Sequence, residues 1–133
     1  MKYVIKVWLF TIIISPLLIA LILGAIINNS SFDSILSSYE IIFVMIIVGF
    51  LSSIPAMVIF WFIKRSLKSK YSNLTEKIIL SLYAFLSVWI TFFIVDNGFV
   101  TKWSEQTIWV LIYSVTIVIG VLIFKINRIE KNE

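Results

Sequence analysis

The side chains best suited to chemistry in this chain are its seven carboxylates, because the sequence contains no histidine and no cysteine. Without those two residue types there are no disulfides, thiolate nucleophiles, imidazole bases or Cys/His zinc sites. A pair of carboxylates can act as general acid and general base when a folded site holds both. Four of them instead fall in two short polar segments, 28–40 and 96–107, where we expect exposed loops. No nucleophile–base pair, metal-ligand cluster or phosphate-binding glycine loop accompanies them. The sequence therefore predicts no enzyme activity and no bound cofactor or metal.

The same four carboxylates form a candidate recognition face on one side of the protein. Four acids against a single base, Lys102, give the two segments a net charge of −3. A surface of this charge attracts a basic partner. Solvation and orientation of the chain are the simpler explanation of the same charges. The residues of this candidate outer face are Asp33, Glu40, Asp96 and Glu105.

Composition places these residues in a membrane protein. Apolar residues make up 61% of the chain and charged residues 14%, against roughly 45–50% and 25% in soluble globular proteins. A soluble domain of 133 residues has too little interior to hide that much apolar surface. The basic pI of about 9.4 would suggest nucleic-acid binding in a soluble protein. Here the basic residues follow a membrane pattern, so we expect no nucleic-acid partner.

Four uncharged, apolar runs are long enough to cross a bilayer as helices. A transmembrane helix needs about 20 mostly apolar residues, within a range of about 17–25. Membrane-spanning strands would alternate apolar and polar residues, which these runs do not. The sequence therefore predicts an all-α membrane protein, a single domain over residues 1–133 built as a four-transmembrane-helix bundle. We expect the first run to be retained rather than cleaved as a signal peptide. The predicted spans are 7–27, 41–63, 78–95 and 107–124.

Lysine and arginine are distributed unevenly between the loops, which predicts the orientation. Two lie before the first span, five in the loop 64–77 and three after the last span, leaving Lys102 alone on the opposite side. Because basic residues collect in cytoplasmic loops, we expect both termini and this loop in the cytoplasm. The loop is also a candidate site for an acidic ligand, but contact with anionic lipid headgroups explains its charge more simply. The residues assigned to topology and headgroup contact are Lys64, Arg65, Lys68 and Lys70.

Small residues four positions apart occur in the predicted spans and indicate close helix packing. Such pairs let two helix backbones approach, and serine or threonine can bond across the contact. No Asp, Glu, Lys, Arg or His lies inside a predicted span, so ion-coupled transport has no visible relay. Pro16 and Pro55 lie inside the first two spans and are expected to kink them, which also occurs at some transport sites. The pairs assigned to packing are Ala20/Gly24, Gly49/Ser53 and Thr116/Gly120.

These features favour a small non-catalytic membrane protein that acts through helix–helix and loop contacts with another membrane protein. Accessory subunits of membrane complexes fit this description. The outline is also similar to that of immunity proteins that protect bacteria against pore-forming toxins, although no sequence motif carries the similarity. The alternative is an oligomeric channel, holin-like pore or small transporter formed by self-association. A composition rich in Ile, Asn, Ser and Lys suggests the bacterial cytoplasmic (inner) membrane, with anionic headgroups on its cytoplasmic side.

Overall fold

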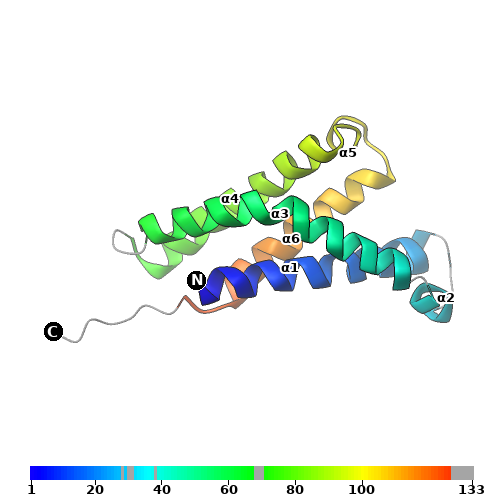
Figure 1. The fold of residues 1–133 in the computed structure, drawn as a ribbon, viewed down its shortest axis with the longest axis horizontal. Coiled ribbons are helices and arrows are strands. Elements are labelled where there is room, and N and C mark those ends of the chain that lie inside the picture. Colours follow the sequence, from blue (N-terminus) through cyan, green and yellow to red (C-terminus); the bar gives the residue numbers. More distant parts are fainter. Residues whose placement is uncertain (28, 30–31, 38, 68–70, 127–133) are drawn as a thin grey trace.

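The computed structural model describes residues 1–27, 29, 32–37, 39–67 and 71–126, and these residues form helices and no strands (Figure 1). Lys68 and Lys70 lie outside the described residues. A π-helical segment, η1, continues the first helix. The elements in chain order are α1 (Lys2–Leu21), η1 (Ile22–Ile27), α2 (Phe32–Ser37), α3 (Tyr39–Leu67), α4 (Asn73–Val95), α5 (Gly98–Thr101) and α6 (Glu105–Ile123).

Four of the described helices are long and apolar enough to cross a membrane, which confirms the predicted all-α architecture with four spans. The helices run past the apolar sequence into charged residues, as α3 does at both ends. Glutamate, lysine and arginine are good helix formers, so a charge ends the apolar run without ending the helix. Glu40 in the first turn of α3 and Lys64 and Arg65 in its last turn also suit the helix dipole. Both α1 and α3 continue through their prolines.

Local side-chain bonds set where the later helices begin. Ser72 caps α4, accepting a hydrogen bond at Oγ from the backbone N–H of Thr75 at 3.3 Å. Ser104 is the N-cap residue of α6, and its backbone N–H donates to the Thr107 hydroxyl at 3.3 Å. Between these helices, Asp96 Oδ1 accepts the backbone N–H of Gly98 at 2.8 Å, making the tight turn from which α5 starts. The short helix α5 lies outside the four predicted spans.

The two ends of the bundle have different architectures (Figure 1). At one end, which we name the closed end, lie the N-terminus, the end of α3 and the start of α4. At the other, the open end, α3 begins beside α2 and η1, while α4 leads into α5 next to the start of α6. The facing halves of α3 and α4 therefore separate toward the open end. Which end lies in the cytoplasm remains a prediction from the charge asymmetry.

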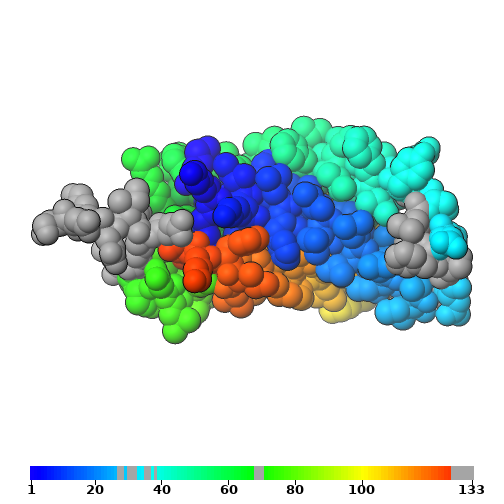
Figure 2. Space-filling model, turned by 90° about the horizontal axis from the view of Figure 1, so that it is seen from below, coloured from blue at the N-terminus to red at the C-terminus, as the bar shows by residue number. Residues whose placement is uncertain are grey.

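Three helices form the core and α3 lies against them. α6 packs closely on α4 and α1, and Figure 2 shows α1 and α6 side by side. In the most apolar stretches of α1, α4 and α6, 28%, 22% and 33% of residues are buried, whereas in α3, which is described throughout, the share is 0%. The two buried residues of α3, Phe60 and Lys64, both belong to its closed-end half. α3 is thus anchored at the closed end.

Candidate functional site

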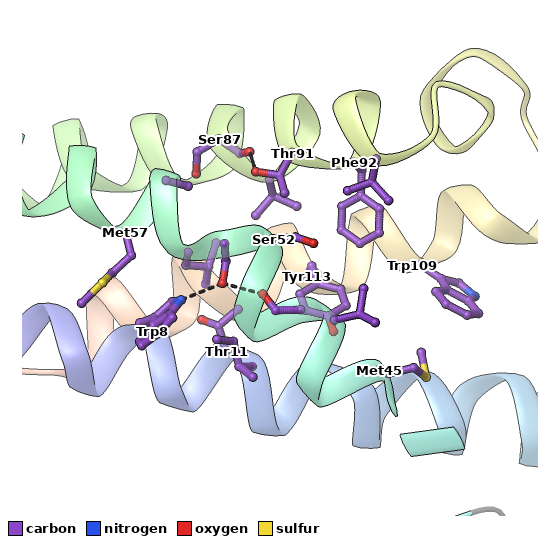
Figure 3. A pocket seen from close by; sticks show the side chains of 18 of the residues that line it. Trp8, Thr11, Met45, Ser52, Met57, Ser87, Thr91, Phe92, Trp109 and Tyr113 are labelled. Atoms are coloured by element: carbon purple, nitrogen blue, oxygen red, sulfur yellow. Dashed lines mark hydrogen bonds between the residues drawn. The ribbon is translucent and has the colours of Figure 1, made fainter. Parts of the chain in front are cut away.

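A cavity of about 320 Å³, which we call the groove, lies between α3 and the other three long helices (Figure 3). Its walls are mostly apolar, with valines, aromatic rings and methionines from all four helices. The cavity volume lies at the lower end of the roughly 300–1,000 Å³ range of small-molecule sites, which are also mostly apolar with a few placed polar groups. The polar groups here are the hydroxyls of Thr11, Ser52, Ser53, Ser87, Thr91 and Tyr113.

Small residues on α3 explain why space remains there. Gly49, Ser52, Ser53 and Ala56 all line the groove on one face of α3. The sequence pattern predicted that Gly49 and Ser53 mediate close helix packing. Gly49 does face another helix closely, since a Cβ at this position would lie 3.4 Å from the Tyr113 hydroxyl oxygen. Around that contact, the small residues of α3 border the groove, because α3 and α4 diverge toward the open end.

Two hydrogen bonds tie the middle of α3 to its neighbours. The Trp8 indole Nε1 donates to Ser53 Oγ at 2.8 Å, and its ring packs on Phe50 with centroids 4.6 Å apart. On the other side, the Tyr83 hydroxyl donates to the Ala56 carbonyl at 3.1 Å. Between the described residues, no side-chain hydrogen bond joins the part of α3 before Gly49 to another helix. The open-end half of α3 is therefore held by apolar contacts alone.

The other predicted packing pairs have mixed environments. Thr116 and Gly120 are buried in α6, and a Cβ on Gly120 would lie 3.2 Å from a ring carbon of Phe10 on α1. This contact is the close helix approach that small residues permit. Ala20 and Gly24 are only partly buried, and Gly24 lies within η1.

All four carboxylates of the predicted outer face lie exposed at the open end. Three of them are close in sequence to residues that line the groove. Glu40 is one turn before the groove residue Val44 in α3, and Glu105 is one turn before the groove residue Trp109 in α6. Asp96 directly follows the groove residue Val95. The positions of these three carboxylates follow from the bounds of α3, α4 and α6 and from the residues that line the groove. We name Glu40, Asp96 and Glu105 the acidic rim; Asp33 lies apart from it on α2.

The closed end buries charged side chains instead. Glu76 is fully buried and Lys64 is 9% exposed. The Lys64 Nζ lies 5.6 Å from the centroid of the Tyr3 ring, a cation–π arrangement, and the Tyr3 hydroxyl donates to the Val121 carbonyl at 2.8 Å. The sequence analysis did not predict the burial of Glu76. The available signal was its spacing to the buried Leu80 and Ala84, four and eight residues later.

Of the two described residues that were assigned to headgroup contact, one is buried and the other is exposed. Lys64 is largely buried under Tyr3, whereas Arg65 is exposed and stacks over Trp61 with its guanidinium carbon 5.7 Å from the ring centroid. Both border a second hollow of about 280 Å³ together with Met1. Their contact with anionic headgroups stays a prediction.

Comparison with known proteins adds no identification, since no family model, no curated protein and no solved structure matches this chain. Within the described residues, no group of three or more acidic side chains could hold a metal ion. The chemistry that the described site offers is binding: an apolar groove with an acidic rim, beside a helix fixed at one end.

Proposed function

We propose that this protein is a non-catalytic, multi-pass membrane protein that acts by binding another membrane protein, with α3 as its main contact helix. The observation that supports this proposal is the exposure of α3. Its most apolar stretch buries no side chain, while its closed-end half is anchored by Phe60 and Lys64. A helix fixed at one end can accept a neighbouring helix without disrupting the core.

The outward face of α3 presents a continuous stripe of large apolar side chains. The exposed members recur every three or four residues, which is the spacing of one helix face. In a bilayer such a face meets either lipid tails or another helix, and van der Waals packing decides which is preferred. The stripe consists of Phe43, Ile47, Leu51, Ile54, Val58 and Phe62.

Two kinds of protein fit this proposal: an accessory subunit of a membrane complex, and an immunity-type protein that captures a pore-forming toxin in a bacterial cytoplasmic membrane. In the orientation predicted by the basic loops, the acidic rim faces outside. A partner with basic residues next to its membrane segment would then find complementary charge beside α3.

Site-specific photocrosslinking in native membranes tests the proposal. A photoreactive amino acid at Ile47, on the stripe, should give one discrete protein adduct. The same group at Ile90, 58% exposed on α4, should give lipid adducts alone. If the adducts formed at Ile47 were the same as those formed at Ile90, a role for α3 in protein binding would be contradicted.

The alternative, an oligomeric channel or small transporter, has one observation in its favour: hydroxyl side chains lie in a cavity between four membrane helices. Those of Ser87 and Thr91 donate to carbonyls of their own helix, at 2.8 and 2.7 Å. Their donor hydrogens are therefore used, while their oxygen lone pairs stay available to a cation or a water molecule. Solute or ion flux through liposomes containing the folded protein would support this alternative.

A further inference from the structure

We propose that the groove holds one acyl chain of a membrane phospholipid whose headgroup carries an ammonium ion, with that ammonium at the acidic rim. The inference goes beyond the proposed protein partner, which would contact the opposite face of α3. It rests on the size of the groove, its chemistry and the charge at its mouth.

The groove is long and narrow. Its lining on α3 alone runs from Val44 to Phe60, about 24 Å of helix at 1.5 Å per residue. The whole cavity has about 320 Å³, although its lining extends from Val4 to Trp109 through much of the bundle. A space this narrow and this long suits a single acyl chain.

The chemistry of the walls also suits an acyl chain. Four of the six hydroxyls that line the groove already donate to backbone carbonyls: Thr11 to Val7 at 2.9 Å, Ser53 to Gly49 at 2.5 Å, Ser87 to Ala84 at 2.8 Å and Thr91 to Ser87 at 2.7 Å. An apolar ligand therefore leaves none of these donors without an acceptor. Apolar cavities stay dry and bind apolar guests, and in a bilayer the available guests are lipid tails.

The rim selects the headgroup. Glu40, Asp96 and Glu105 lie next to groove residues on three different chain segments, and all are exposed. A lipid whose tail enters between the separating halves of α3 and α4 would place its headgroup between Glu40 on one wall and Asp96 and Glu105 on the other. They attract an ammonium group and repel a headgroup with net negative charge.

Native mass spectrometry after reconstitution tests the groove. The protein is placed in nanodiscs of equimolar phosphatidylethanolamine and phosphatidylglycerol, then extracted into mild detergent. We expect one retained phosphatidylethanolamine. Ser52→Phe and, from the opposite wall, Thr91→Leu should each fill the groove and release it. Leu86→Phe, at a 58% exposed position of α4, is the matched control and should retain it. Binding of phosphatidylglycerol at the closed end, near Lys64 and Arg65, should be unaffected by these substitutions.

Neutralising the rim tests the headgroup assignment. Glu40→Gln with Glu105→Gln should lower the preference for phosphatidylethanolamine by about two- to five-fold for each carboxylate, the range expected of exposed charge pairs. Asp33→Asn, at the same end but on α2, should not change it. Two results would overturn the proposal: a folded wild type that retains no ethanolamine lipid, or a Ser52→Phe variant that retains as much as wild type.

Discussion

The closed and open ends of this bundle use α3 in opposite ways. At the closed end, Phe60 and Lys64 of α3 are buried in a cluster with Tyr3, and fully buried Glu76 lies at the same end. At the open end, α3 presents small residues to a cavity and keeps its charge, Glu40, at the surface.

This contrast separates stability from binding. Residues that bury large side chains or charges hold the four helices together, and changing them should unfold the protein. On α3, the groove residues from Val44 to Met57 all stay partly or largely exposed, so they are free to accept a ligand or partner. The predictions below compare matched positions in the two ends.

The largest difference in stability between the two ends should come from truncating side chains of α3. Phe60 is 5% exposed and Val44 is 57% exposed. Phe60→Ala should lower the free energy of unfolding by about 3–5 kcal/mol because it leaves a cavity in the closed-end cluster. Val44→Ala should cost less than about 0.5 kcal/mol, as is usual for exposed positions. Reversible unfolding in mixed micelles measures both. Equal losses would mean that α3 is anchored along its whole length.

Adding a methyl group at the two close-approach glycines should have opposite effects. Gly120→Ala pushes a Cβ to 3.2 Å from the Phe10 ring, and overpacking of this kind costs about 1–3 kcal/mol. Gly49→Ala meets Tyr113 at an ordinary 3.4 Å, so the gain in helix propensity, up to about 1 kcal/mol, should dominate. Thermal midpoints in detergent should therefore fall for the first variant and hold or rise for the second.

The smallest effect concerns the tie between α1 and α3. Ser53→Ala removes the acceptor of the Trp8 indole and should cost about 1 kcal/mol. Hydrogen exchange should then become faster in α3 before Gly49 and stay unchanged around Phe60. Faster exchange around both residues would show that this bond supports the whole helix.

Sequence alone predicted the parts of the fold that depend on hydropathy. The four uncharged runs predicted the four long helices. The helix α3 extends past the predicted span 41–63 to Leu67, because lysine and arginine are good helix formers and a charge does not end a helix. α5 was missed because four residues after a turn carry no periodic pattern.

The candidate site was harder to predict because it depends on how helices meet. The small residues of α3 were identified, and so were the carboxylates of the rim. That the small face of α3 around Gly49 also borders a cavity follows from the divergence of α3 and α4, which no pattern within one helix encodes. Burial of Glu76 likewise follows from which face of α4 turns inward.

The most direct test of the account is a pair of distance measurements between spin labels on α3 and α4. The chain contains no cysteine, so labelled cysteines can be introduced without removing native ones. One pair, at Phe62 and Ile78, reports the closed end, and the other, at Phe43 and Ile94, reports the open end; all four positions are exposed. We predict a narrow distance distribution for the first pair in lipid, and for the second a broader one that narrows when phosphatidylethanolamine is present. Distributions of equal width that do not respond to lipid would contradict the claim that α3 is fixed at one end and free at the other.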